Sequence, residues 1–282
     1  MKITILVDNT ALFDRFFTAE HGFSAYIEAE GCRVLFDTGC SDAVLNNAQK
    51  MKIDLLDLDY IVLSHGHLDH TGGLYHLIRL FSEAIQKDTS CHLPKLIAHP
   101  RCFYPRPKPP LPDIGAVLTG DEVQRIMPLD LSKDPVNLTP DLFFLGEIER
   151  KFSFETTPPG PRRIVMPDGS VQEDHLIDDT SIAYRSREGL VIITGCAHAG
   201  ICNTTEYAKK ICGEERVLDI IGGLHLRGEG PQLEGTLDYL KGQNLTALHA
   251  CHCTALPAKV ALARVVPLQE TGVGLRLEYG DR

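Results

Sequence analysis

Three histidines and an aspartate lie within six residues, in the stretch Ser64-His65-Gly66-His67-Leu68-Asp69-His70. The apolar run 60–63 leads straight into this stretch, so a buried strand would deliver all four side chains to one place. Burying that many polar groups costs several kcal/mol unless each finds a partner, and Zn²⁺ binds both imidazole nitrogen and carboxylate oxygen. A solvated histidine-rich loop is the alternative. The stretch predicts a metal site.

The spacing divides these side chains into two pairs. Gly66 allows a sharp turn, so His65 and His67 can face one ion. Asp69 and His70 follow where the chain is expected to enter a helix, and they can bind a second ion.

A catalytic zinc site usually has three protein ligands and an open position, so His65 and His67 need a third partner. Each of three further histidines could by itself be an ordinary core or loop residue, but all three follow predicted strands beside a strong metal motif. His198 is the best candidate, and His249 is close enough to His252 to be mistaken for it. The histidines are His198 after 190–193, His225 after 217–221 and His252 after 245–248.

The elements that position these residues form two similar halves. In the first half, a strand at 33–36 runs into Thr38-Gly39-Cys40; in the second, a strand at 190–193 runs into Thr194-Gly195-Cys196, which suggests an internal duplication. Apolar residues at helical spacing predict further helices, and polar-ended apolar runs predict further strands. The helices are expected at 74–85 and at 233–240 before Gly242, and the strands at 1–7, 25–28 and 181–184.

The middle of the chain is rich in proline: fourteen of the seventeen prolines lie between Pro94 and Pro167. Proline cannot continue a helix or donate to a strand ladder, so this segment is expected to be loop or extended structure. Long loops in compact domains are often lids or binding loops. Arg101 and Arg106 lie in the segment and could offer positive charge to an anionic substrate. A solvated surface insertion is the alternative.

Composition limits the class of protein. The chain has 282 residues, 43% of them hydrophobic, and a net charge of −10, which argues against nucleic acid as the main partner. No apolar run reaches the roughly 18 residues of a membrane span. Nine cysteines without a Cys-x-x-Cys pair, and no evident signal peptide, suggest reduced thiols in a cytoplasmic protein. Nothing in the composition indicates an oligomeric state.

These motifs, in this order, resemble the metallo-β-lactamase superfamily. The match rests on the His-x-His-x-Asp-His stretch after a strand, the upstream Phe-Asp-Thr-Gly, a Gly-x-x-His turn and a late His-Cys-Thr. A finer match, to proteins like 7,8-dihydropterin-6-methyl-4-(β-D-ribofuranosyl)aminobenzene 5′-phosphate synthase, rests on five segments. They are 6–9, 20–24, 194–203, 222–226 and 252–254. The resemblance implies an α/β fold, a four-layer αββα sandwich of two mixed sheets flanked by helices. It implies one domain over 1–282, with the proline-rich lid or insertion at about 94–167.

The resemblance also assigns roles. It implies that His65, His67 and His198 bind one divalent ion and that Asp69, His70 and His252 bind a second. Asp37 is expected to support the loop that carries the metal ligands without binding the metal itself. Most dinuclear relatives add a bridging aspartate. Asp219 is the only carboxylate in the corresponding strand, but the subgroup pattern points to His225. We expect Asp219 to be a buried supporting residue and His225 to face the cleft, with Asp69 and His225 catalytic. Substrate-binding residues are expected to be His21, Arg101, Arg106 and Asn203, the last at a helix start suited to phosphate.

Three functions fit these features. The first is a metal-dependent hydrolase, a phosphodiesterase that acts on a small phosphorylated substrate through metal-activated water. The second is a pterin synthase or transferase that joins a hydroxymethyl-dihydropterin diphosphate to a ribofuranosyl-aminobenzene phosphate. The third is a non-catalytic metal- or ligand-binding protein. The expected cofactors are one or two divalent ions, Zn²⁺ first and Mn²⁺ or Fe²⁺ as alternatives. The expected partner is a small anion, with no nucleic acid and no membrane.

Overall fold

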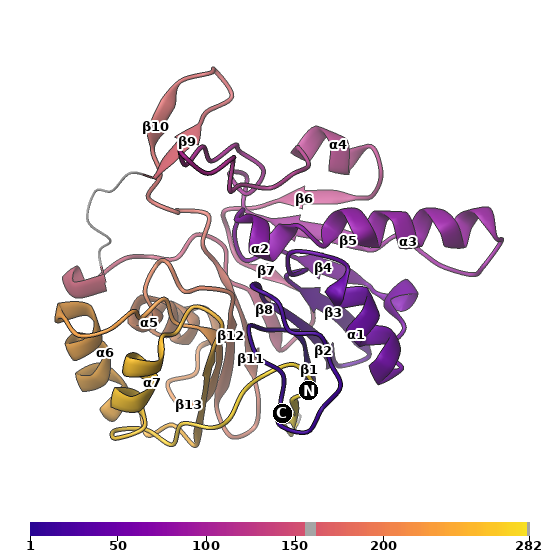
Figure 1. Cartoon of the computed structure of the whole chain (residues 1–282). Coiled ribbons are helices and arrows are strands. Elements are labelled where there is room, and N and C mark those ends of the chain that lie inside the picture. Colours follow the sequence, from indigo (N-terminus) through magenta and orange to yellow (C-terminus); the bar gives the residue numbers. More distant parts are fainter. Residues whose placement is uncertain (156–161, 281–282) are drawn as a thin grey trace.

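The computed structural model describes residues 1–155 and 162–280, and within them the chain forms two large mixed β-sheets that pack face to face (Figure 1). The first sheet has the strand order β15-β1-β2-β3-β4-β5-β6. Its strands are β15 (Arg276–Glu278), β1 (Lys2–Val7), β2 (Ser24–Ala29), β3 (Cys32–Phe36), β4 (Tyr60–Val62), β5 (Lys95–Ala98) and β6 (Leu129–Leu131). From β15 to β3 the pairing is antiparallel, and from β3 to β6 it is parallel.

Helical crossovers join the parallel strands of this sheet, as parallel pairing requires. Between β3 and β4 lie α1 (Ala43–Met51) and the 3₁₀ turn η1 (Leu55–Asp57). Between β4 and β5 lie α2 (Leu68–Thr71), which carries the end of the metal motif, and α3 (Leu74–Gln86). The short α4 (Gly120–Gln124) precedes β6. The helix predicted at 74–85 is therefore confirmed as α3.

The second sheet has the order β14-β13-β12-β11-β8-β7. Its strands are β14 (Ala247–Cys251), β13 (Val217–Gly223), β12 (Leu190–Thr194), β11 (Ser181–Arg185), β8 (Leu142–Phe144) and β7 (Val136–Asn137). The strands β12, β13 and β14 are parallel, and α5 (Ile201–Cys212) and α6 (Pro231–Lys241) connect them. The helix α7 (Leu256–Leu262) follows β14. The parallel strand–helix–strand units in both sheets agree with the two similar halves predicted from the sequence.

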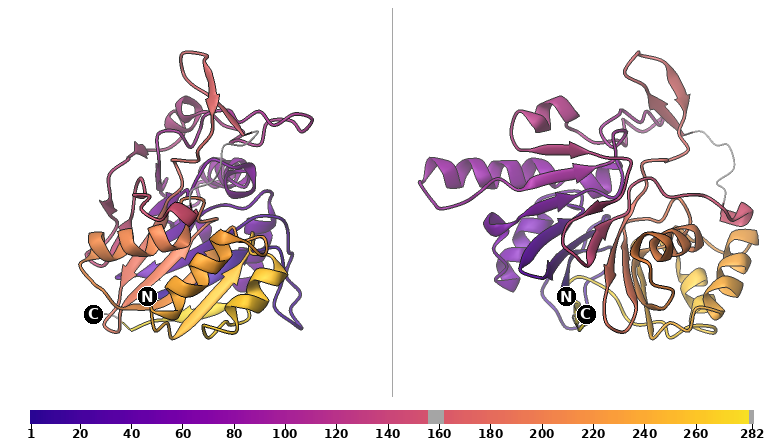
Figure 2. Two further views of the ribbon diagram at one scale, coloured as in Figure 1. Left: turned by 90° about the vertical axis from the view of Figure 1, so that its left-hand side faces the viewer. Right: turned by 180° about the vertical axis from the view of Figure 1, so that it is seen from behind.

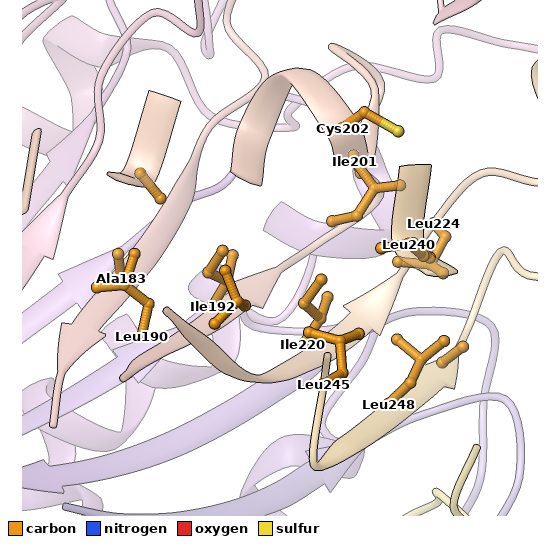
Figure 3. Close-up of a cluster of buried hydrophobic side chains, with 14 of the residues drawn as sticks. Ala183, Leu190, Ile192, Ile201, Cys202, Ile220, Leu224, Leu240, Leu245 and Leu248 are labelled. Carbon is orange, nitrogen blue, oxygen red and sulfur yellow. The ribbon is translucent and has the colours of Figure 1, made fainter. Parts of the chain in front are cut away.

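Alternation along the strands separates the core into three clusters. Side chains of successive strand residues point to opposite faces, so Ile193 packs between the sheets while Ile192 faces the helices. Ile3, Phe36 and Phe144 join Ile193 in the cluster between the sheets. Figure 3 shows the cluster on the outer face of the second sheet, where α5 and α6 add apolar side chains. A third cluster joins the first sheet to α1 and α3. The predicted four-layer αββα sandwich is therefore confirmed.

The proline-rich segment 94–167 is not one long loop: part of it is extended, as predicted, and its role as a lid or an insertion stays a prediction. It contributes β5 and β6 to the first sheet and β7 and β8 to the second. Proline lacks a backbone N–H and so is tolerated just before a strand, and several prolines stand there. They are Pro94 before β5, Pro128 before β6, Pro135 before β7 and Pro140 near the start of β8. The remaining irregular part holds the 3₁₀ turn η2 (Ser153–Glu155). Residues 156–161 lie outside the described residues.

The hairpin of β9 (Arg163–Val165) and β10 (Val171–Glu173) extends away from both sheets (Figures 1 and 2). Among the described residues, no helix is both long enough and apolar enough to cross a membrane.

Candidate metal centre

The predicted metal ligands come from loops at the carboxyl ends of parallel strands, and these ends meet at one edge of the sandwich. His65 and His67 follow β4, and His70 lies in α2. His198 follows β12 and His252 follows β14. Five histidines separated by up to 187 positions in the sequence thus come together in space.

The first group consists of His65, His67 and His198. The Nε2 atom of His65 lies 2.9 Å from Nδ1 of His67, and the ring of His198 lies 4.8 Å and 5.1 Å from those two rings. His65 and His198 are buried. Within residues 1–155 and 162–280, Nε2 of His67 and both ring nitrogens of His198 have no hydrogen-bond partner. A buried polar atom without a partner costs about 1–3 kcal/mol, so these nitrogens fit a metal ion.

The second group consists of Asp69, His70 and His252. The Nε2 atoms of the two histidines lie 3.2 Å apart. The Oδ2 atom of Asp69 is 3.3 Å from Nε2 of His252 and 3.6 Å from Nε2 of His70. Three potential ligand atoms therefore converge on one point, as they would around a second ion.

The outer nitrogens of these rings are held by other residues. Asp37 is fully buried, and its Oδ2 atom lies 2.7 Å from Nδ1 of His70. Ser64 donates to Asp37 from both its backbone N–H and its hydroxyl, each at 2.7 Å. On the other side, Nδ1 of His252 lies 2.9 Å from Oδ1 of Asn9. Such contacts fix the ring orientation and leave Nε2 free for an ion.

Burial sets the protonation of the first group. It lowers the pKa of His65 and His198 well below the ordinary value. Burial, with a contribution from the positive charge of Arg106, lowers the pKa of His67 to about 3. Neutral imidazole is the form that binds metal, so these rings are already in that form at neutral pH.

The second group differs in charge. Burial opposes protonation of His70, but Asp69 and Asp37 outweigh it and raise its pKa to about 9. Burial also opposes ionisation of Asp69, yet His70 and hydrogen bonds from His21 and His252 lower the pKa of this carboxyl far below its usual range. The carboxylates of Asp37 and Asp69 therefore favour a positive charge at this position, which a bound cation would also supply.

His21 and His225 line the exposed rim of the centre. Nε2 of His21 lies 3.1 Å from Oδ2 of Asp69, and the side chain of His21 is 72% exposed. The ring of His225 lies 4.4 Å from that of His198. Burial and the positive charges of Arg227 and Arg162 lower the pKa of His225 to about 4. Neither arginine was predicted to be a site residue, because both lie outside the motifs that the sequence analysis used.

Several residues of the centre have backbone angles that non-glycine residues rarely adopt. The φ angle is +58° at Asp37, +52° at Ala197, +47° at His225 and +48° at His252. Such conformations each cost about 1–3 kcal/mol and tend to cluster at functional sites. The loops that carry the candidate ligands are therefore held in strained geometry.

Asp219 is buried and hydrogen-bonded, as predicted, but it does not support a ligand. One of its carboxylate oxygens lies 3.0 Å from Nδ1 of His249, and the other accepts a hydrogen bond of 2.6 Å from the Tyr279 hydroxyl. His249 therefore points to Asp219, which leaves His252 as the histidine of the metal centre. The role of Asp219 is to join β13, β14 and the segment after β15.

Arg106 does not face a substrate, and this corrects the prediction. Its side chain is 1% exposed, and the guanidinium donates to Asp174 at 2.9 Å and to Asp178 at 2.6 Å. Both carboxylates lie far along the chain, so the nearby sequence could not reveal them. Arg101 is half-buried, and its assignment to substrate stays a prediction.

Asn203 was also expected to bind substrate, and the structure contradicts this. Asn203 is buried, and its Oδ1 accepts hydrogen bonds from the backbone N–H groups of Lys151 and Phe152. The first N–H groups of α5, from Cys202 and Asn203, donate to the Glu155 carboxylate at 2.8 Å each. Gly200 allows this approach, since a Cβ there would lie 2.2 Å from Oε2 of Glu155. A carboxylate of the chain itself thus occupies the helix start predicted to bind phosphate.

Cys196 is a further residue of the centre that the sequence did not single out as a ligand. Its thiol is buried, and Sγ lies 3.2 Å from Nε2 of His70. Burial raises the pKa of this thiol well above its ordinary value. The only feature of the sequence that pointed to Cys196 was the repeated Thr-Gly-Cys pattern, which the sequence analysis interpreted as a sign of internal duplication.

Comparisons with known proteins agree with this geometry. A family model described as "Metallo-beta-lactamase superfamily" matches residues 17–209. The 7,8-dihydropterin-6-methyl-4-(beta-D-ribofuranosyl)-aminobenzene-5'-phosphate synthase of Methanocaldococcus jannaschii is 32% identical over 273 residues, covering 92% of this chain and 89% of the relative. The crystal structure of Tm1679, described as a metal-dependent hydrolase of the beta-lactamase superfamily, aligns over 100% of both chains with a TM-score of 0.82 and 27% identity. Zn(2+)-bound PqqB from Methylobacterium extorquens shares the fold at a TM-score of 0.53 and 12% identity, over 99% of this chain and 100% of PqqB.

Proposed function

Because the chain belongs to the metallo-beta-lactamase superfamily, whose fold implies divalent metal binding, we propose that it is a metal-dependent hydrolase of a small phosphorylated substrate, a phosphodiesterase. One observation carries the proposal. Among the described residues, buried nitrogens of His67 and His198 have no hydrogen-bond partner, although they lie inside a tight group of imidazoles. Leaving such an atom without a partner costs about 1–3 kcal/mol, and a divalent ion suits neutral imidazole.

We assign His65, His67 and His198 to one ion, and Asp69, His70 and His252 to the second. Zn²⁺ fits the high proportion of imidazole, with Mn²⁺ and Fe²⁺ as alternatives for metal analysis to distinguish. When bound, the ions supply Lewis-acid activation of water and of a phosphoryl oxygen. Asp37 and Asn9 hold the outer nitrogens of His70 and His252 and so keep both rings aimed inward.

An anionic substrate is supported by charge at the rim. Burial, followed by the positive charges of Arg227 and Arg162, lowers the pKa of His225, so both arginines contribute positive charge near this ring. We assign to these two arginines the role predicted from the sequence for Arg106, which is to offer positive charge to an anionic substrate. The chain as a whole carries a net charge of −10, so this local positive field favours a small anion over a nucleic-acid backbone.

His21 and Asp69 supply proton chemistry at the rim. The ionised Asp69 carboxylate lies 3.1 Å from Nε2 of His21, and this hydrogen bond is the largest cause that raises the pKa of His21. His21 is exposed, so its protonated ring can reach a bound substrate and give its proton to a leaving oxygen. Asp69 holds that ring in place while also binding metal, and His225, whose ring lies 4.4 Å from that of His198, is assigned to the substrate side of the first group.

A pterin synthase is the second candidate, and the relative from Methanocaldococcus jannaschii favours it. The same centre could bind the diphosphate of a hydroxymethyl-dihydropterin while a ribofuranosyl-aminobenzene phosphate displaces it. A non-catalytic metal- or ligand-binding protein is the third candidate, and the rim residues His21 and His225 argue against it, because neither is assigned to an ion and a site that only binds metal does not need them.

A parallel assay separates the three candidates. The purified protein, loaded in turn with Zn²⁺, Mn²⁺ and Fe²⁺, is tested against phosphodiesters, phosphomonoesters and the two pterin-pathway substrates named above. Hydrolysis of a phosphodiester, lost in His67→Ala and kept in the surface variant Lys50→Ala, supports the proposal. Condensation without hydrolysis establishes the synthase. Tight metal binding with neither reaction leaves the binding protein.

A further inference from the structure

Cys196 lies between the two groups of candidate ligands. Its Sγ atom belongs to one set of potential ligand atoms with His65 and His198, and to a second set with His70 and His252. In each set all the ligand atoms lie within 4.8 Å of one another. Among the described residues, Cys196 is the one that these two sets share.

The separations suit coordination. A zinc ion lies about 2.3 Å from sulfur and about 2.1 Å from imidazole nitrogen, so two such ligands on one tetrahedral ion are about 3.6 Å apart. The observed distance from Sγ of Cys196 to Nε2 of His70 is 3.2 Å. One ring nitrogen of His198, two residues further on, lies within 4.8 Å of Sγ of Cys196 and of a ring nitrogen of His65, and neither nitrogen of His198 has a hydrogen-bond partner among the described residues.

The surrounding backbone holds the thiol there. A Cβ at Gly195 would lie 2.2 Å from Oγ of Ser64 and 2.7 Å from Oδ2 of Asp37, so this turn packs directly on the residues that orient His65 and His70. The positive φ of Ala197 then turns the chain so that Cys196 and His198 both face the centre. The thiol position is therefore fixed by packing that admits no other residue than glycine at 195.

Two candidate bridging carboxylates, Asp219 and Asp69, have other contacts. Asp219 contacts His249 and Tyr279, away from the centre. Asp69 already belongs to the second group and contacts His21. His225 contacts His198, but a neutral imidazole has one lone pair on its free nitrogen and cannot bridge two cations. A thiolate has several lone pairs and a full negative charge.

We propose that the Cys196 thiolate bridges the two metal ions, in the place where most dinuclear relatives use an aspartate. The proposal rests on the metal centre of the proposed function and adds the ligand that couples its two halves. On binding, the S–H bond breaks, the proton passes to solvent, and two metal–sulfur bonds form. The second ion is then bound less tightly in any variant that lacks this sulfur.

X-ray absorption at the zinc edge tests the bridge without any assay of activity. In protein loaded with two zinc ions per chain, a thiolate shared by both gives about one sulfur neighbour per zinc at about 2.3 Å, and a thiolate on one ion gives about half of that. Cys196→Ser should lose the sulfur signal and bind the second zinc at least 10-fold more weakly. Cys253→Ser is the matched control, because Cys253 contacts the backbone of Cys196 at 3.6 Å but belongs to neither ligand set.

The outcomes are distinct. Two zinc ions with about one sulfur each, lost in Cys196→Ser and kept in Cys253→Ser, support the bridge. Zinc without sulfur, about half a sulfur per zinc, a single zinc per chain, or loss of the signal in Cys253→Ser overturns it and leaves the proposed hydrolase standing. A chain that binds no metal overturns both. If Cys196→Ser does not fold, a Co²⁺ titration of the wild type decides: a thiolate charge-transfer band that grows through both equivalents supports the bridge, and one that stops after the first contradicts it.

Discussion

Two buried polar clusters lie next to Gly66, and their central side chains, Arg106 and His198, differ in how completely their nitrogens are partnered. Among the described residues, Oδ1 of Asp178 in the arginine cluster also has no hydrogen-bond partner. In the arginine cluster, Arg106 makes five hydrogen bonds, which go to Asp174, Asp178 and the carbonyls of 101, 102 and 104. A guanidinium has five N–H donors, so its capacity is used in full. In the histidine cluster, within the described part of the chain, both ring nitrogens of His198 have no partner.

The contrast teaches how to separate structural from functional burial. Both clusters are charged, buried and close together, so burial alone does not distinguish them. A saturated group has no capacity left for a ligand, while an unsaturated one requires a ligand. Arg106 is therefore structural. Gly66 joins the clusters, because its N–H donates to Asp178 at 2.9 Å and a Cβ there would lie 1.9 Å from the Cys102 carbonyl. The arginine cluster holds the loop that carries His65 and His67.

The largest effect is expected from removing a ligand. In His65→Ala or His67→Ala, too few groups remain to fix the first ion. Loss of a supporting contact alone costs 10–100-fold in metal affinity, so loss of a ligand should exceed about 100-fold and abolish turnover. Elemental analysis and turnover measure this, with Lys50→Ala as control. Full metal content and normal turnover in either variant would remove the basis of the comparison.

The next effect is expected from the arginine cluster. Arg106→Met leaves Asp174 and Asp178 buried without their partner, which should lower the free energy of unfolding by about 3–5 kcal/mol. Urea unfolding of the metal-free protein measures it. Arg101→Ala, at a half-buried position, should stay within about 0.5 kcal/mol of the wild type. A raised KM in Arg106→Met with unchanged stability would instead restore the predicted role in substrate binding.

Removal of the metal sharpens the comparison. A bound metal whose free concentration is 100 times its Kd stabilises the folded state by about 2.7 kcal/mol. When a chelator removes metal present at that concentration, the free energy of unfolding should fall by the same amount. The same loss should occur in Lys50→Ala and should be absent in His67→Ala, whose centre is already incomplete. Equal stability with and without chelator in the wild type would mean that the histidine cluster binds no ion.

The smallest effect separates Asp219 from His225. Asp219→Asn should lower the free energy of unfolding by about 1–3 kcal/mol, since the contacts with His249 and Tyr279 weaken, and should leave metal content unchanged. His225→Ala should reduce turnover and barely change stability. Thermal melts with metal analysis decide the matter. Loss of one metal per chain in Asp219→Asn, together with full activity of His225→Ala, would reverse the two assignments.

The sequence was sufficient for features that depend on nearby residues. Helical spacing located α3 and α6, and strand ends located the histidines. It was insufficient where partners are distant, since Arg106 pairs with Asp174 and the start of α5 pairs with Glu155. The two Thr-Gly-Cys turns show the same limit. Cys40 is half-buried beside Glu20, while Cys196 lies inside the histidine cluster, although the local pattern is identical.

The pairing of β1 with β15 has a consequence for how the protein is made. The loop after β14, which carries His252, is also held by the loop after β1. The backbone N–H of His252 donates to Asp8 at 2.9 Å, across 244 positions of sequence. Contacts of such long range form slowly, and during synthesis the early strands have no β15 to pair with. The nascent chain therefore presents an open edge at β1 until residues 276–278 have been synthesised.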